Sequence, residues 1–255
     1  MESLSFDAFR RLFEKKVGEY GITWEAVGFY APDGKVYPFG TDTKVISTVF
    51  EALAAPLIRE IADAWGYTIE GSEQTVYPDF TLTPPSHQPP RIAIDIKTTY
   101  RRRGVGDCLH PFRFTLGSYT SFLRTPGAKK NIKYPYVQYG DHWIIGFLYT
   151  RRAGVGAKVY YRLEDVSELL CPYTAVEYYV QEKYRIVGLT PASGNTTNIG
   201  SFPTNRIEDL REGIGPFSQH GKAVCDEYWR HFPSRKSDRA YSTVEQFLAW
   251  KKRQS

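Results

Sequence analysis

Two aspartates and one lysine have the types and spacing to hold a divalent cation beside a phosphate. Asp95 and Lys97 alternate with three isoleucines in segment 92–97, which puts the charges on one face of an expected strand and the isoleucines on the other. Charges on a strand that its neighbours bury are usually paired or bound to metal. Carboxylate oxygens suit Mg²⁺, which polarises a phosphate and lowers the pKa of a bound water, and the lysine would orient that water.

The second carboxylate, Asp79, comes from a short segment upstream. The sequence Tyr77-Pro78-Asp79-Phe80 runs into residues 81–83, a second short strand that could pair with the first through a turn-rich stretch of prolines. Two carboxylates and a lysine would then converge at one sheet edge. This pattern resembles the PD-(D/E)xK nuclease signature, although so short a pattern also fits a surface hairpin with an ion pair.

The composition is that of an ordinary globular protein with a mild positive charge. Of the 255 residues, 42% are hydrophobic, and we see neither a membrane-spanning run nor a secretory signal, so we expect a cytoplasmic protein with no membrane partner. The net charge of +5 favours an anionic partner. The run Arg101-Arg102-Arg103 beside the candidate site fits either phosphate contacts or a solvated loop. Three widely spaced cysteines argue against a disulfide framework and a zinc cluster.

Apolar spacing predicts the elements that surround these residues. Segment 6–17 has the pattern of an amphipathic helix, and segment 27–37 that of a hairpin around a Pro-Asp-Gly turn. The apolar run 143–149 suits a central buried strand, segment 178–187 a second hairpin, and segment 242–251 a helix. Helices alternating with strands predict an α/β or α+β fold, in which helices flank a mixed central sheet and accessory β hairpins are added.

One long helix is expected between the first hairpin and the acidic strands. Thr48 and Glu51 form a possible capping box at its start. Pro56 should kink or restart this helix, and Gly66 should end it.

Segment 193–201 is dense in small, hydrogen-bonding residues. Glycine permits a close backbone approach, and an asparagine amide can donate to and accept from the edge of adenine in the major groove. The loop therefore has the chemistry to read DNA. The alternative is a turn-rich loop whose Asn and Thr side chains satisfy their own backbone.

Together with the acidic strands, this loop resembles the EcoRV-type family of type II restriction endonucleases. The resemblance consists of blocks in one order over nearly the whole chain, namely Gly34-Lys35-Val36-Tyr37-Pro38, Asp42-Thr43-Lys44-Val45, Tyr77-Pro78-Asp79-Phe80-Thr81-Leu82, residues 92–100, Tyr119-Thr120-Ser121-Phe122, His142-Trp143-Ile144-Ile145-Gly146 and residues 193–201.

The resemblance implies a Mg²⁺-dependent enzyme that cuts both strands of DNA. Asp79 and Asp95 would hold Mg²⁺, and Lys97 would assist the attack of water on phosphorus. The family also has an acidic residue on the long helix near the site, which matches Glu51 as a further catalytic and metal-binding carboxylate. For Glu51 the capping box remains the competing interpretation.

The family resemblance also implies an organisation and a target. The chain would be a single restriction-endonuclease domain over residues 1–255 that forms a homodimer on double-stranded DNA. Within it, residues 20–40 would form a dimerisation hairpin, residues 45–150 the catalytic core and residues 175–255 the DNA-recognition region. The implied target is GATATC, cut to blunt ends at its centre.

DNA contacts are implied residue by residue. Asn195 would read adenine, and the small residues around it would contact guanine through their backbone. Ala192 departs from the family, which has glycine there, but with a negative φ its N–H would stay free to meet the base. Beside Gln74 in the minor-groove loop, Glu73 and Thr75 replace amides. The full implied set is Ala192, Ser193, Gly194, Asn195, Thr196, Asn198, Gln74, Thr98, Tyr100 and Ser121.

Two other functions fit part of the pattern. A repair or junction nuclease of the same superfamily could use the same carboxylates while reading DNA shape. A DNA-binding module without catalysis would gain nothing from carboxylates placed beside phosphates, and a glycosidase would leave Lys97 and the basic run without a role.

Overall fold

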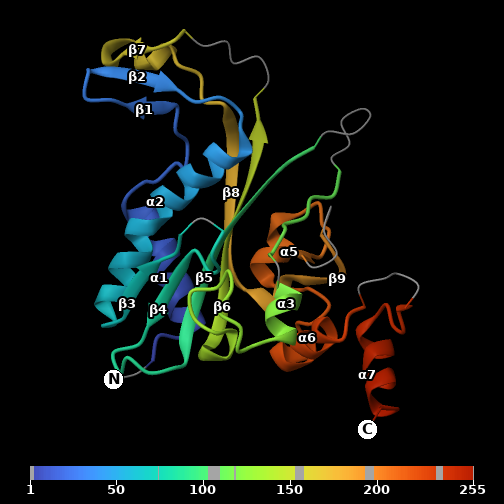
Figure 1. Cartoon of the computed structure of the whole chain (residues 1–255). Helices are drawn as coiled ribbons and strands as arrows, with labels where there is room; N and C mark the ends of the chain where they lie inside the picture. The colour runs from blue at the N-terminus through green and yellow to red at the C-terminus, as the bar shows by residue number, and fades with distance from the viewer. Residues whose placement is uncertain are drawn as a thin grey trace.

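A five-stranded mixed β-sheet forms the centre of the computed structural model, which describes residues 3–73, 75–102, 110–117, 119–152, 158–192, 198–233 and 238–254 (Figure 1). Neighbouring β5 and β6 are parallel, and every other pair is antiparallel. The expected mixed central sheet is therefore confirmed. Its strands, in spatial order, are β3 (Thr68–Gly71), β4 (Phe80–Thr83), β5 (Arg91–Tyr100), β6 (Tyr139–Arg151) and β8 (Tyr173–Glu182).

Strands β5 and β6 are covered on both faces, as expected from their apolar runs. Ile94 and Trp143 belong to the hydrophobic core on one face of the sheet, whereas Ala93 and Ile144 belong to the core on the other. The expectation of a central buried strand over residues 143–149 is thus confirmed.

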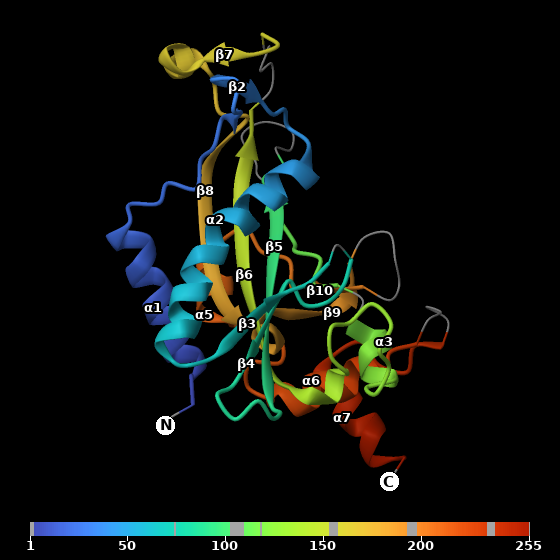
Figure 2. The same cartoon turned by 60° about the vertical axis from the view of Figure 1, so that its left-hand side comes forward.

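The first face of the sheet is covered by α1 (Phe6–Glu19) and α2 (Thr43–Ala64), as Figure 2 shows. Helix α1 starts at Ser5, whose Oγ accepts the Ala8 N–H at 3.3 Å, and it buries Phe9, Phe13 and Val17. The amphipathic helix expected over residues 6–17 is confirmed, because these apolar residues recur at helical spacing on the buried side.

Helix α2 begins earlier than the sequence suggested. Asp42 is its N-cap and accepts the Lys44 N–H at 2.8 Å, whereas the hydroxyl of Thr48 donates to the Lys44 carbonyl inside the helix. The capping box at Thr48 and Glu51 is therefore wrong, as is a restart at Pro56, because the helix runs through that residue. The expected end is confirmed, since Gly66 follows the helix with φ +70°.

Short helices cover the second face of the sheet. The helix expected over residues 242–251 is confirmed as α7, whose N-cap is Thr243. The hairpin expected over residues 178–187 is wrong, because a helical turn follows β8 and leads into a separate two-stranded sheet. These elements are α3 (Tyr119–Arg124), α4 (Lys183–Ile186), β9 (Val187–Pro191), β10 (Ile199–Ser201), α5 (Ile207–Glu212), α6 (Gly221–Arg230) and α7 (Val244–Lys252).

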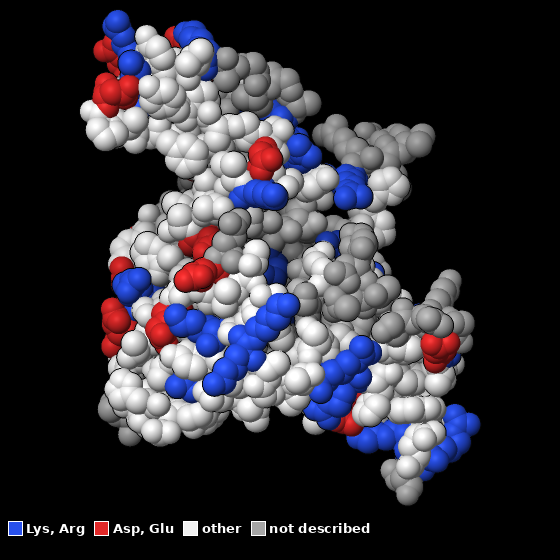
Figure 3. All heavy atoms as spheres, in the orientation of Figure 1, with Lys and Arg blue, Asp and Glu red and all other residues white. Residues whose placement is uncertain are grey.

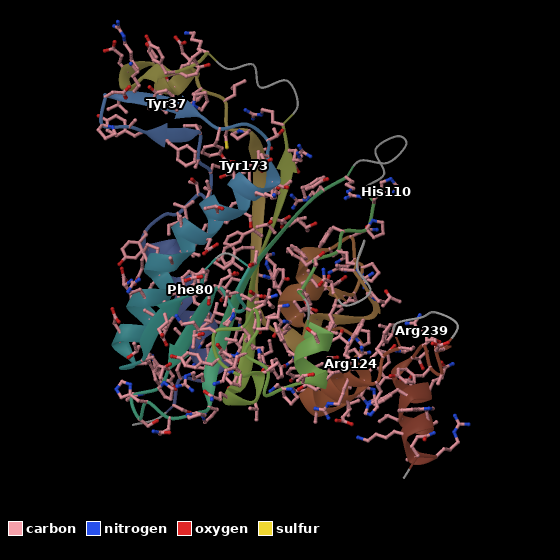
Figure 4. The ribbon with its side chains drawn as sticks, viewed as in Figure 1. Tyr37, Phe80, His110, Arg124, Tyr173 and Arg239 are labelled. Atoms are coloured by element: carbon pink, nitrogen blue, oxygen red, sulfur yellow. The ribbon has the colours of Figure 1, made fainter. Side chains whose placement is uncertain are left out.

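A three-stranded sheet projects from the far end of β6 and β8 (Figures 1 and 2). Its strands are β1 (Gly28–Tyr30) and β2 (Lys35–Pro38), which form the expected hairpin, and β7 (Tyr161–Arg162). Tyr173 joins it to the central sheet, since its hydroxyl donates to the Trp24 carbonyl at 3.0 Å and accepts the Ala26 N–H at 3.2 Å. Figure 4 shows Tyr37 in the projecting sheet, Tyr173 at this junction and Phe80 in the central sheet. Two 3₁₀ segments, Tyr136–Gln138 and Leu163–Glu168, complete the described elements.

Two other expectations concern membrane-spanning segments and the cysteines. No helix in the described part of the chain has the length and apolar content needed to cross a membrane. Cys171 and Cys225 are buried free thiols, and Cys108 lies outside the described residues.

Gly146 gives a test of the packing beside the acidic strand. It lies on β6 between Lys97 of β5 and Tyr179 of β8, and a Cβ there would overlap the buried Tyr179 ring. Gly146→Ala should therefore destabilise the protein by about 1–3 kcal/mol, as overpacking of a core does, measured by denaturant unfolding. Gly71→Ala is the control, because a Cβ at that end of β3 meets nothing within 4 Å. Similar losses in both variants would contradict the packing argument.

Candidate active site

Strands β4 and β5 bring the predicted chemical residues together. Phe80 pairs with Ile94 across the two antiparallel strands, so Asp79, immediately before β4, lies beside the middle of β5. Its Oδ2 accepts the backbone N–H of Ile96 at 2.6 Å. The predicted convergence of Asp79 and Asp95 is confirmed, but it lies at the middle of the sheet rather than at an edge, because β5 is the central one of the five strands.

The ammonium of Lys97 lies between the two carboxylates. Its Nζ is 2.8 Å from Asp95 Oδ2 and 3.8 Å from Asp79 Oδ2, and it also donates to the Ile96 carbonyl at 3.2 Å. The Asp95 side chain is 3% exposed, whereas that of Asp79 is 28% exposed. The cluster therefore has a buried inner end at Asp95 and a solvent-facing outer end at Asp79.

Burial and mutual repulsion control the charges of this cluster. Burial, reinforced by the negative charge of Asp95, raises the pKa of Asp79 to about 7, although Lys97 and the Ile96 N–H oppose the shift. For Lys97 burial alone would lower the pKa, but the two aspartates outweigh it, so the pKa lies above its usual value. Lys97 thus stays protonated at neutral pH and can donate hydrogen bonds or stabilise negative charge, but it cannot accept a proton.

A cavity of about 530 Å³ opens onto the three residues. Ser121, an expected DNA contact, lines this cavity, as does Gly117. Sequence reasoning missed the wall contributed by segment 125–131, where Lys130 adds a positive charge; its Lys-Lys pair in a turn was the available signal. The cavity is lined by Thr75, Val76, Tyr77, Asp79, Asp95, Lys97, Gly117, Ser121, Phe122, Thr125, Ala128, Lys130 and Asn131.

Two partly or fully buried groups outside the cavity lining act on this site through their charge. Burial raises the pKa of Glu51 on α2, while Lys97 lowers it and Asp95 raises it, so this carboxylate lies within electrostatic range of both residues. With the capping box excluded, no local role competes for Glu51. Lys183 was not anticipated: its buried ammonium lies 4.7 Å from the centroid of the Tyr77 ring.

The donor set fits a magnesium ion that is also bound by substrate. Mg²⁺ typically takes one or two protein carboxylates and completes its shell with water and phosphate oxygens. Asp79 and Asp95 supply two such carboxylates, and no group of three His, Cys, Asp or Glu side chains among the described residues is arranged to hold a metal ion. The carboxylates of Asp79, Asp95 and Glu51 all interact with Lys97, and a divalent cation bound by Asp79 and Asp95 would add positive charge among them.

The predicted DNA contacts are only partly within the described residues. Gln74 and residues 193–197, which include Asn195, lie outside them. Ala192 is buried, and its N–H donates to the Asn198 carbonyl at 2.9 Å across the base of the loop. The expectation that this N–H is free to meet a base is therefore wrong, because it closes the loop. Thr98 is half-buried on β5, and Tyr100 lines a second cavity of about 330 Å³ together with Ala192.

Arg101 is tied down by protein contacts. Its guanidinium pairs with Glu177 and donates to the Ala175 carbonyl at 2.8 Å, so it is neither a solvated loop residue nor a free phosphate ligand. Arg102 is exposed and lies over the ring of Tyr100, with its Cζ 5.4 Å from the ring centroid. Residues 103–109 lie outside the described residues.

The raised pKa of Asp79 predicts how this site affects stability. The unfolded chain ionises Asp79 near pH 4 and the folded protein near pH 7, so stability falls as pH rises between these values. Asp79→Asn resembles the protonated side chain. In a metal-free buffer the variant should match the wild type near pH 4 and exceed its free energy of unfolding by roughly 1–2 kcal/mol at pH 8, after a discount for partial exposure.

Denaturant unfolding at the two pH values in EDTA makes this measurement. Asp63→Asn, an exposed carboxylate on α2, is the matched control and should show no such pH-dependent gain. An Asp79→Asn protein no more stable than the wild type at pH 8 would show that burial and the charge of Asp95 do not destabilise the ionised carboxylate.

Comparison with known proteins agrees with this geometry. The family model described as restriction endonuclease EcoRV matches residues 21–252. The chain is 40% identical over 231 residues to the type II restriction enzyme EcoRV of Escherichia coli, and the match covers 89% of this chain and 91% of that protein. A match of this extent includes both acidic strands, the residues that line the cavity and loop 192–198, so the chain belongs to the EcoRV family of type II restriction endonucleases.

Proposed function

We propose that this endonuclease is a Mg²⁺-dependent homodimer that cuts double-stranded DNA at GATATC and leaves blunt ends. The observation that carries the proposal is the convergence of Asp79, Asp95 and Lys97 at one open cavity, in a chain of this family. Two carboxylates and an ammonium at a cavity of this kind suit phosphodiester hydrolysis, in which negative charge builds on phosphorus.

Each residue has a distinct task in the proposed reaction. Asp79 and Asp95 hold Mg²⁺, which when bound polarises the phosphate and lowers the pKa of water. Lys97, protonated and anchored to Asp95, orients the attacking water and stabilises charge on the phosphate. Glu51 contributes a further negative charge beside the cation from α2. The products are 5′-phosphate and 3′-hydroxyl ends.

Surface charge supports a DNA substrate. The chain carries a net charge of +5. In Figure 3, Lys and Arg side chains spread over the lower part of the visible face, while Asp and Glu lie mainly toward its left side. Phosphate contacts from such side chains supply most of the affinity for DNA of any sequence.

The projecting sheet supports the homodimer. Its strands and the residues flanking β7 carry most of the large apolar side chains that are exposed among the described residues, including Phe29, Tyr30, Val159 and Leu163. Tyr30 is 63% exposed and Val159 is 83% exposed, which is costly for a free monomer. A twofold dimer through this sheet would present two active sites to a palindromic target, one for each strand.

Removing a proposed metal ligand should abolish cleavage without unfolding the protein. Asp79→Ala and Asp95→Ala should each reduce the cleavage rate of GATATC-containing DNA at least about a thousandfold, because each removes a charge that binds Mg²⁺. Lys97→Ala should lose cleavage but keep Mg²⁺ affinity, since its ammonium competes with the cation for both carboxylates. Digestion of DNA of known sequence with end mapping, together with Mg²⁺ titration, measures these effects.

Asp63→Ala removes an exposed carboxylate from α2 and serves as the control, with cleavage expected at the wild-type rate. Near wild-type cutting by either aspartate variant would contradict the metal site. A wild-type digest with ends away from GATATC would contradict the proposed target.

Asn195 should contribute to base readout. Asn195→Ala should cost roughly 1–3 kcal/mol of discrimination at one adenine position, as loss of a bidentate contact does, while binding to unrelated duplexes hardly changes. Competition binding with single-base variants of the target makes the comparison. Equal losses on target and unrelated DNA would mean that Asn195 contacts the DNA backbone instead.

A further inference from the structure

The hairpin that carries loop 192–198 has a weak ladder of hydrogen bonds. Strand β9 ends at Pro191, which has no N–H to donate, and β10 has three residues. Their register shifts between Ile199 and Ser201, which marks a bulge or irregularity in the pairing. A two-stranded sheet of this length is marginally stable by itself. Contacts from outside the hairpin therefore help to hold the base of the loop.

The side chain of Arg113 links β9 and β10 by hydrogen bonds to a carbonyl on each strand. Its Nε donates to the Ser201 carbonyl on β10 at 2.7 Å, and its Nη2 donates to the Thr190 carbonyl on β9. Burial lowers the pKa of Arg113, in keeping with a guanidinium partly withdrawn from solvent. The planar, multiply donating guanidinium thus bridges carbonyls on both sides of the loop base.

Gly200 gives the guanidinium its path across β10. A Cβ at Gly200 would lie 2.6 Å from Arg113 Nη2 and 2.7 Å from its Cζ, so any larger residue would displace the group. The atoms that would have to move are the far end of a flexible side chain, so an alanine at this position can be accommodated by moving Arg113 away. The glycine and the arginine therefore form one contact that can be broken from either side.

The backbone around Arg113 connects the same hairpin to the active-site cavity. Ser201 donates to the Phe114 carbonyl at 2.9 Å, and Leu116 donates to the Ile199 carbonyl at 2.8 Å. Ile199 in turn donates to the carbonyl of Gly117, which lines the cavity of the catalytic residues. Segment 112–117 is thus hydrogen-bonded along β10 on one side and borders the cavity at its end.

We propose that Arg113 is a positioning residue for base recognition, whose guanidinium fixes the base of loop 192–198 across Gly200. This inference rests on the proposed function, in which residues 193–197 read the bases. Arg113 itself need not touch a base. It acts by holding β9 and β10, from which the loop starts and to which it returns, at a fixed separation.

The competing role for Arg113 is a direct phosphate contact, and charge distinguishes the two. Arg113→Gln removes both the charge and the bridge. Gly200→Ala keeps the charge but displaces the bridge. Arg102→Gln removes an exposed charge from the cavity of about 330 Å³ that Arg113 also lines, and it leaves the bridge intact. Arg113→Lys keeps the charge and reaches one carbonyl at a time, so it should recover part of the function if geometry is what matters.

Three quantities are measured on each folded variant. The first is the ratio of cleavage rates on the target and on a duplex with one altered base pair. The second is affinity for an unrelated duplex, with its salt dependence. The third is amide hydrogen exchange at Ala192 in the absence of DNA, which reports on the bond that closes the loop.

Arg113→Gln and Gly200→Ala should both lower the cleavage ratio about tenfold and speed exchange at Ala192, with Arg113→Lys in between. Gly200→Ala should leave unrelated-duplex affinity within about twofold, and Arg102→Gln should keep the wild-type ratio. If Gly200→Ala fails to fold, the other variants carry the test: the cleavage ratio should fall, and exchange at Ala192 should speed up, in the order wild type, Arg113→Lys, Arg113→Gln.

Wild-type exchange at Ala192 in Arg113→Gln would overturn the positioning role. The role would also be overturned if Arg113→Gln kept the wild-type cleavage ratio but bound all DNA more weakly and with a smaller salt dependence. That result would identify a direct phosphate contact. A wild-type enzyme that shows no site preference while Arg113→Gln still speeds exchange would instead overturn the proposed target readout and leave the bridge standing.

Discussion

The ammonium of Lys97, held between Asp79 and Asp95, is the interaction on which the rest of the site depends. Two carboxylates this close together repel each other, and a buried ion cluster is stable only with close pairing and further hydrogen bonds. Strand β5 meets that need because β4 and β6 bond it on both sides. Hydrophobic cores on both faces then offset the cost of this cluster, in which burial, reinforced by the charge of Asp95, keeps the pKa of Asp79 near 7.

The convergence of Asp79, Asp95 and Lys97 could be predicted from the sequence because it depends on local sequence patterns. Alternation fixes which side of β5 carries Asp95 and Lys97, and a short turn-rich connection makes antiparallel pairing with the segment after Asp79 the simplest outcome. The start of α2 was not readable in this way. Asp42 and Thr48 both have capping side chains, and only the burial of Ile46 and its neighbours against the sheet decides between them.

Longer-range contacts escaped sequence reasoning altogether. The guanidinium of Arg113 contacts carbonyls 77 and 88 residues away along the chain. Ala192 was weighed by whether its φ leaves the N–H free, whereas the structure uses that N–H to close the loop on Asn198. No local pattern encodes the contacts of Arg113, because they arise only when segment 112–117 packs along β10.

The residues proposed for catalysis and the loop proposed for base recognition are therefore held in place by different kinds of contact. Asp95 and Lys97 lie on a central strand, where bonding on both sides leaves little freedom for the reacting groups. The loop proposed to read the bases connects the strands of a short, irregular hairpin, and Arg113 hydrogen-bonds to both strands. Segment 112–117 contacts both, through β10 and through the cavity wall at Gly117. The base of the loop is thus joined by backbone hydrogen bonds, through β10 and segment 112–117, to the wall of the cavity that Asp79, Asp95 and Lys97 line.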